Sequence, residues 1–183
     1  MTKLSRAQAP EEKVAKGEFI LQVAERIIRY EGLEALSMNR LVQETGFAKG
    51  TLYLYFTTRH EILASLFVQM LTAWHHRLGK SLTKARNYDE FCARYMRELT
   101  YDPLFLPMLV LERLDLETGL PDDTYAQVSL ALATGSGRTG RSVQRNIGFD
   151  GSACLKFGLG LLHGGAGGRE ISTIPKHAGL RFV

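Results

Sequence analysis

The sequence has few cysteines and no long apolar run. Its 183 residues include two cysteines, Cys92 and Cys154, and neither has a companion at metal-binding or redox spacing. The longest apolar run, residues 104–111, is interrupted by Pro107, whereas a helix that spans a membrane needs about 20 apolar residues. No charged and then apolar leader precedes a small-residue cleavage site. We therefore expect a soluble, cytoplasmic protein with no membrane partner.

A recognisable catalytic or metal-binding set is also missing. Five histidines are present, and the adjacent pair His75 and His76 would point about 100° apart on a helix, which makes a shared metal ion difficult. No Ser/His/Asp set and no pair of carboxylates has an interpretable spacing. We therefore expect that the protein is not an enzyme and holds no metal or cofactor.

Charge is distributed unevenly along an otherwise ordinary globular composition. The net charge of +4 is the sum of +2 in residues 1–60, −3 in residues 61–133 and +5 in residues 134–183. A mildly basic protein favours polyanionic partners, although such a bias acts mainly on solubility and encounter rates.

Apolar periodicity predicts a first helix that ends at Gly32, a residue type that commonly follows the last turn of a helix. Its apolar stripe consists of Phe19, Ile20, Val23, Ala24, Ile27 and Ile28. Ser37 is a suitable N-cap for a short second helix over residues 38–45, and Gly46 would end that helix.

Further helices are predicted downstream of Gly46. A third helix begins near Ala48 and runs to Tyr55, and the spacing of Thr58 and Glu61 is that of a capping box for a long fourth helix, which ends near residue 82. Helical spacing resumes over residues 91–99 and 104–114. Residues 1–133 are therefore predicted to be all-α.

Two short helices joined by a tight glycine turn follow the helix-turn-helix plan, in which the second helix enters the major groove of DNA. Small side chains at Ala48 and Gly50 would let the backbone approach DNA closely. The other candidate contacts reach bases or phosphates through hydroxyl groups, cationic groups or helix N-termini; they are Ser37, Arg40, Lys49, Thr51, Tyr53, Tyr55 and Arg59.

Residues 37–63, SMNRLVQETGFAKGTLYLYFTTRHEIL, resemble the signature of the TetR family of bacterial repressors. The resemblance extends over residues 17–67 and, more weakly, over residues 68–133 with the segment LVLERLDLETGL. It implies DNA-contact roles for Ser37, Lys49, Gly50, Thr51, Tyr53, Tyr55 and Arg59. Residue 59 is usually lysine in the family, and arginine keeps the charge and adds a fork for phosphate.

The resemblance also implies how the chain is organised and what it does. We expect a flexible arm over residues 1–16, a three-helix DNA-binding domain over residues 17–60, and a helical ligand-binding and dimerisation domain over residues 61–133. A homodimer would bind a palindromic double-stranded DNA operator as a repressor, and a small-molecule effector would release it.

Residues 134–183 depart from the family pattern. Twelve of the eighteen glycines fall in this region, and each glycine inside a helix costs up to about 1 kcal/mol relative to alanine. Residues 155–161 even alternate as a strand does. We therefore expect an atypical, Gly-rich ending, of divergent origin or from a shifted reading frame. The corresponding alternative is a DNA-binding protein that has lost sensing or dimerisation.

A second alternative is a nucleotide-binding enzyme. The segment Gly135–Gly140 has the spacing G-x-G-x-x-G after an alternating run, and such a loop can hold a pyrophosphate at a helix N-terminus. The full fingerprint also needs a second strand and an acidic residue about 20 positions on, whereas Asp150 follows Gly135 by fifteen. A surface loop is the simpler interpretation.

An effector site would need an apolar cavity between helices. Aromatic and methionine side chains of the middle region are its candidate lining, although the same side chains would also make an ordinary core. They are Trp74, Phe91, Tyr95, Met96, Phe105 and Met108. Because residues 61–133 are acidic overall, we expect an apolar or mixed ligand rather than a strongly anionic one.

Overall fold

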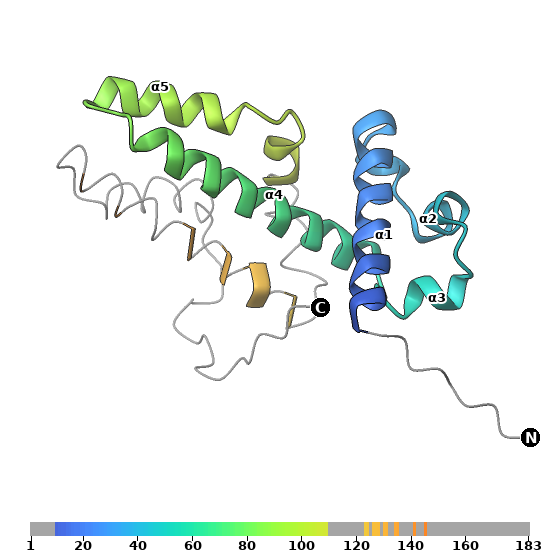
Figure 1. Ribbon diagram of the computed structural model, residues 1–183. Coiled ribbons are helices and arrows are strands. Elements are labelled where there is room, and N and C mark those ends of the chain that lie inside the picture. The colour runs from blue at the N-terminus through green and yellow to red at the C-terminus, as the bar shows by residue number, and fades with distance from the viewer. Residues whose placement is uncertain are drawn as a thin grey trace, which may run out of the picture. The chain divides into compact units, whose positions relative to one another are not determined.

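The computed structural model describes residues 10–109 and a few single residues and short pieces between residues 123 and 145 (Figure 1). All regular elements in these parts of the chain are helices, which confirms the predicted all-α class there. The Gly-rich region 134–183 lies outside the described residues except for four of its positions, 134, 135, 141 and 145. Within the described ranges, no helix is both long enough and apolar enough to cross a membrane.

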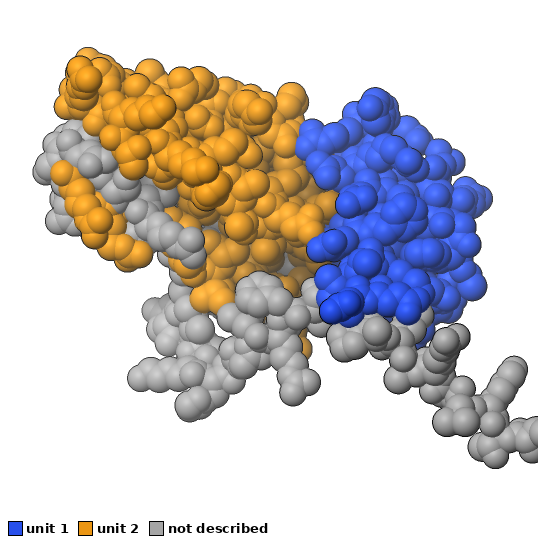
Figure 2. Space-filling view, in the orientation of Figure 1, with its two compact units in different colours: residues 1–62, 175–183 blue, residues 63–174 orange. Residues whose placement is uncertain are grey.

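The chain divides into two compact units (Figure 2). The described part of the first unit ends at residue 62. It contains α1 (Pro10–Glu31), the short η1 (Leu33–Ala35), α2 (Met38–Thr45), α3 (Lys49–Tyr53) and the start of α4 (Arg59–Leu82). The second unit contains the remainder of α4 and α5 (Tyr88–Leu99).

Helix α1 begins at Pro10 and therefore covers residues 10–16, for which the sequence predicts a flexible arm. Proline is favoured in the first turn because it has no N–H to lose there, and Glu11 and Glu12 interact well with the positive end of the helix dipole. Lys16 donates a hydrogen bond to Glu12 at 2.8 Å. Local signals of this kind lengthen a helix without adding to its apolar stripe.

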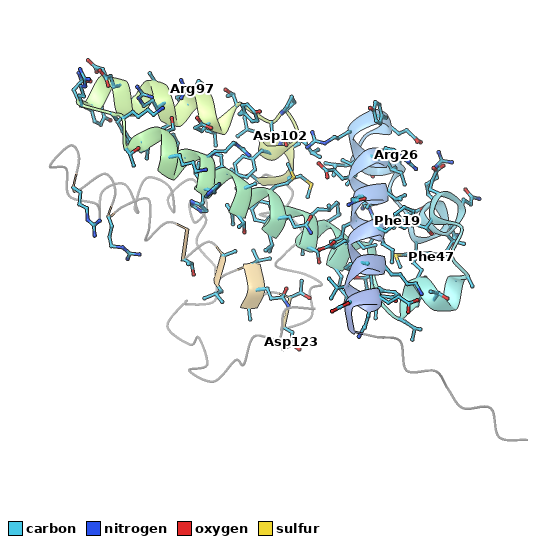
Figure 3. The ribbon with its side chains drawn as sticks, in the orientation of Figure 1. Phe19, Arg26, Phe47, Arg97, Asp102 and Asp123 are labelled. Atoms are coloured by element: carbon cyan, nitrogen blue, oxygen red, sulfur yellow. The ribbon has the colours of Figure 1, made fainter. Side chains whose placement is uncertain are left out.

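The apolar stripe of α1 forms the core of the first unit. Five of its six predicted members are at most 3% exposed: Ile20, Val23, Ala24, Ile27 and Ile28. Phe19 differs because it is 43% exposed, and its ring lies 5.8 Å from that of Phe47, which stands just before α3 (Figure 3). One aromatic pair thus covers the margin of the stripe, while Leu41 of α2 and Leu52 of α3 are completely buried.

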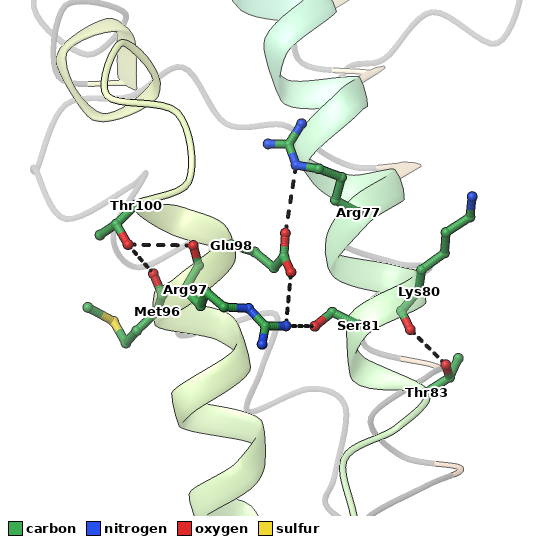
Figure 4. Close-up of polar contacts among 8 residues, drawn as sticks. All are labelled: Arg77, Lys80, Ser81, Thr83, Met96, Arg97, Glu98 and Thr100. Carbon is green, nitrogen blue, oxygen red and sulfur yellow. Dashed lines mark hydrogen bonds and ion pairs between the residues drawn. The ribbon is translucent and has the colours of Figure 1, made fainter.

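In the second unit, a buried carboxylate joins α4 to α5 (Figure 4). Glu98 of α5 is 9% exposed, and its oxygens lie 3.7 Å from Arg77 Nε and 3.3 Å from Arg97 Nη2. Arg97 Nη2 also donates to Ser81 Oγ of α4 at 2.8 Å. The Arg77 guanidinium lies 4.7 Å from the ring centre of Tyr101. One carboxylate therefore pairs with an arginine of each of the two helices.

We predict that Glu98→Gln lowers the free energy of unfolding of the second unit by about 1 kcal/mol, since Glu98 is buried but its partners Arg77 and Arg97 are 31% and 61% exposed and water screens the charge that is left. Urea unfolding followed by the fluorescence of Trp74 would measure this loss. Glu18→Gln, on the exposed face of α1, is the matched control and should change the value by less than about 0.5 kcal/mol. Equal stability of the two variants would contradict the prediction.

Candidate nucleic-acid interface

Helix α2 is held at both ends by local interactions that its sequence predicts. The Oγ of Ser37 accepts the backbone N–H of Arg40 at 3.1 Å, which caps the first turn. Gly46 ends the helix with φ of 69° and donates its N–H to the Val42 carbonyl at 3.1 Å. A residue with a Cβ would be strained in this left-handed conformation. The turn into α3 therefore depends on glycine at position 46.

Helix α3 begins after Ala48 and is shorter than predicted. The N–H groups of Thr51 and Leu52 both donate to the Ala48 carbonyl, which closes the first turn. After Tyr53 the chain tightens: the N–H groups of Leu54 and Tyr55 bond three residues back, to Thr51 and Leu52, and the Phe56 N–H shares the Leu52 carbonyl. Such bonds tighten the last turn of a helix.

The exposed side of α3 carries a cation, a glycine and a phenol. Lys49 and Gly50 are exposed, Thr51 is half-buried and Tyr53 is 39% exposed. The Lys49 Nζ lies 5.8 Å from the centre of the Tyr53 ring, a distance at which a cation and an aromatic face attract each other. The ammonium and the ring, from the first and last residues of α3, are therefore presented together on its exposed side.

Leu54 is 76% exposed beside this surface, and it was not among the predicted contact residues. It follows the buried Leu52 by two positions, which is about 200° around a helix. That spacing places Leu54 on the opposite side from the core, so its exposure could have been predicted from the sequence.

Tyr55 lies against α1 and differs in this respect from Tyr53. A Cβ built on Gly17 would be 3.7 Å from Cδ1 of Tyr55, and Tyr55 is half-buried. The pKa of Lys16 is raised, chiefly by its hydrogen bond to Glu12. The phenol of Tyr55 is thus close to α1.

Two of the predicted phosphate contacts are engaged within the first unit. Arg59 Nη2 donates to the Leu33 carbonyl at 2.8 Å, which joins the start of α4 to η1. Arg40 pairs with Glu31 at 3.0 Å and with Glu44 at 3.1 Å. Both guanidinium groups therefore hold the helices of the domain in place, and only their remaining N–H groups are left for a partner.

The start of α4 is capped as the sequence predicts. Glu61 N–H donates to Thr58 Oγ1 at 3.1 Å, and the Glu61 carboxylate accepts from both the N–H and the hydroxyl of Thr57 at 2.6 and 2.7 Å. The carboxylate thus bonds the residue before the N-cap, one position earlier than in the usual capping box. The loop between α3 and α4 is consequently held by hydrogen bonds.

The predicted effector-site residues are largely brought together in the second unit. The Trp74 ring stacks on Phe105 at 5.3 Å between centroids and meets the edge of Tyr95 at 5.7 Å. Phe91 and Met108 are likewise buried. Met96 is not part of this cluster: it is 54% exposed and lies about 100° around α5 from its neighbour Tyr95. The buried five pack as a core.

The nucleotide-loop alternative rests on Gly135–Gly140, of which the structure describes Gly135 as helical. A Cβ at this position would collide with the imidazole ring of His75. Glycine is therefore required here by close packing, which explains it without a bound phosphate. Across the described part of the chain, no three histidine, cysteine or carboxylate groups are grouped so that they could hold a metal ion.

Comparison with known proteins identifies the first unit. Residues 20–66 match the family model described as bacterial regulatory proteins, tetR family. The chain is 35% identical over 82 residues to the uncharacterized HTH-type transcriptional regulator YvdT of Bacillus subtilis (strain 168), and the match covers 45% of the chain and 41% of that protein. It is 28% identical over 89 residues to an uncharacterized HTH-type transcriptional regulator of Haemophilus influenzae, covering 49% of the chain and 48% of the relative. The chain thus spans less than half the length of these relatives.

We predict that Ser37→Ala lowers the free energy of unfolding by about 1 kcal/mol, because alanine cannot accept the Arg40 N–H at the start of α2. Ser37→Asp is the matched variant, since aspartate is an equally good N-cap and should keep the stability of the wild type. Urea unfolding followed by circular dichroism would compare the three proteins. A Ser37→Ala protein as stable as Ser37→Asp would show that the cap contributes nothing.

Proposed function

Since this chain belongs, through residues 20–66, to the tetR family of bacterial regulatory proteins, we propose that it is a transcriptional repressor that binds double-stranded DNA as a homodimer. In this proposal α3 lies in the major groove and the N-terminus of α2 faces the phosphate backbone. A small-molecule effector binds the second unit and lowers the affinity for the operator. The effector must favour the released state over the DNA-bound state to have this effect.

The observation that carries the proposal is the division of α3 into two sides. Leu52 is completely buried, whereas Lys49, Gly50 and Tyr53 are exposed. A short helix with a buried leucine needs no lysine and tyrosine on its opposite side for stability. An ammonium group and a phenolic hydroxyl beside a glycine are, however, suitable for contact with phosphates and base edges.

Gly50 supports a close approach to DNA. A Cβ at this position would meet no atom of the described protein within 4 Å, and no positive φ is found there. Folding therefore does not require glycine at position 50, although glycine weakens a helix by about 0.5–1 kcal/mol relative to alanine. Close contact with a partner such as DNA would explain a glycine at position 50.

The remaining predicted contacts take different roles in this proposal. Lys49, Thr51 and Tyr53 reach bases or phosphates from α3. Ser37 brings the N-terminus of α2 to a phosphate, and Tyr55 adds a hydroxyl near the end of α3. Arg40 and Arg59 act mainly by holding the helices in position, with a phosphate contact through the N–H groups that remain.

Binding to duplex DNA and assembly as a dimer test the proposal separately. A gel shift with DNA from upstream of the gene, at stated salt, should give a discrete complex, because phosphate contacts make the affinity depend strongly on salt. The mass of the free protein measured by light scattering should be that of a dimer. A monomer that still binds DNA would instead favour a DNA-binding protein without the dimer interface.

We predict that Lys49→Ala weakens DNA binding roughly tenfold at low salt, since one charge-assisted contact is lost. The slope of log affinity against log salt should fall by about 1. Fluorescence anisotropy with labelled duplex measures both quantities. The control is Lys80→Ala, because Lys80 is an exposed cation of α4. An unchanged slope for Lys49→Ala would mean that the ammonium does not contact phosphate.

We predict opposite effects of Gly50→Ala on stability and on DNA binding. The free energy of unfolding should rise by about 0.5 kcal/mol, because alanine is the better helix former, while the affinity for DNA should fall at least roughly tenfold through a clash worth 1.4 kcal/mol or more. Urea unfolding and anisotropy are measured on the same preparation. If both quantities rose together, DNA would not approach the backbone at Gly50.

A further inference from the structure

A hollow in the second unit lies where α4 is connected to α5, apart from the aromatic core. It has a volume of about 490 Å³ and a mostly polar lining. The lining residues are Thr83, Lys84, Ala85, Arg86, Glu90 and Arg94. Three of them are cations and one is an anion, which gives the hollow a net charge of +2.

The arginines of this hollow differ from the other arginines of residues 10–109. Six arginines in that range donate to or pair with a group of the protein through their side chains: Arg26, Arg29, Arg40, Arg59, Arg77 and Arg97. Within the same range, Arg86 and Arg94 have no such side-chain partner. The Nε of Arg94 is buried without a hydrogen-bond partner in the described structure, as are those of Arg40, Arg59 and Arg77, but Arg94 alone of these four forms no side-chain hydrogen bond or ion pair there. Within residues 10–109, the two arginines with no side-chain hydrogen bond or ion pair thus line one hollow.

Glu90 lowers the charge of the hollow by one, but its carboxylate is bonded to the backbone and forms no ion pair with the two arginines. Its Oε2 accepts the N–H of Arg86 at 3.1 Å, and its own N–H donates to Asn87 Oδ1 at 2.9 Å. These two bonds close the start of α5 as a capping pair. The guanidinium groups of Arg86 and Arg94 and the ammonium of Lys84 are left to face the hollow with their donors available.

We propose that this hollow is a binding site for a small anion that carries a phosphate group. A phosphate monoester has a charge between about −1.5 and −2 near pH 7, which matches the net +2 of the lining. Guanidinium groups form paired hydrogen bonds to phosphate oxygens, and a lysine adds a point charge. A phosphate oxygen would supply the acceptor that the buried Arg94 Nε lacks.

This site differs from the effector site predicted from the sequence in both place and ligand chemistry. The expectation of a ligand that is not strongly anionic came from the acidic sum of residues 61–133. The local balance at the hollow has the opposite sign, because several acidic residues of that range lie elsewhere. Phosphate binding here requires neither DNA nor an effector in the aromatic core.

Titration of the full chain with inorganic phosphate tests the proposal. Chemical shifts or calorimetry would be measured at constant ionic strength, with acetate as the comparison anion. We expect saturable binding of phosphate and roughly tenfold weaker binding of acetate, which offers fewer oxygens and less charge. Arg86→Gln and Arg94→Gln should each weaken phosphate binding about tenfold.

Lys80→Gln is the matched control, because Lys80 is an exposed cation of α4 outside the hollow. It should bind phosphate as the wild type does. Arg94→Lys keeps the charge but not the fork, so it separates the two contributions if Arg94→Gln does not fold. Phosphate binding that is equal in the wild type and both glutamine variants would overturn the proposal. So would a site that responds to duplex DNA but not to inorganic phosphate.

Discussion

The left-handed backbone at Gly46 is the constraint on which the candidate DNA-binding surface depends. Its φ of 69° and its hydrogen bond to Val42 end α2 and direct the chain into α3 within three residues. Because of this turn, Leu41 and Leu52 are both completely buried, and the burial of each contributes on the order of 2 kcal/mol. Burying Leu52 in turn places Lys49 and Tyr53 on the outer side of α3. Exposure of the contact residues is thus a consequence of core packing.

The positively charged residues have two roles: some bond to groups of the protein itself, and others are available to bind an anion. Arg40 and Arg59 bond acidic groups and a backbone carbonyl within the first unit. Arg77 and Arg97 share the buried Glu98 in the second. These arginines fix one helix against another, because each interacts mainly with its partner inside the protein. Lys49 in the first unit, and Arg86 and Arg94 in the second, remain available for anions. The nearly balanced total charge of the chain does not reveal this division.

Much of the helical framework could be predicted from the sequence because its signals are local. Ser37, Gly46 and Thr58 act on groups within four residues, so the bounds of α2 and the start of α4 follow from them. The start of α1 and the end of α3 differ from the predicted ones, and both differences have local causes as well. Helix α1 begins at Pro10 because of a favourable first turn without apolar side chains, and α3 ends at Tyr53 where the N–H groups of Leu54 and Tyr55 bond three residues back. Neither cause can be recognised from the spacing of apolar residues.

The sequence by itself determined the helical class, the glycine turn and the identity of the side chains on α3, since each depends on neighbours along the chain. Only the tertiary structure decided which charged groups are engaged. The acceptor of Arg59 is 26 residues away, and Arg40 pairs with Glu31 of another helix. The tertiary structure also distinguished Tyr53 from Tyr55 and Met96 from the aromatic core. Within residues 10–109, it distinguished the two arginines that lack a side-chain partner from the six that have one. These outcomes depend on distances between helices, which composition and periodicity do not contain.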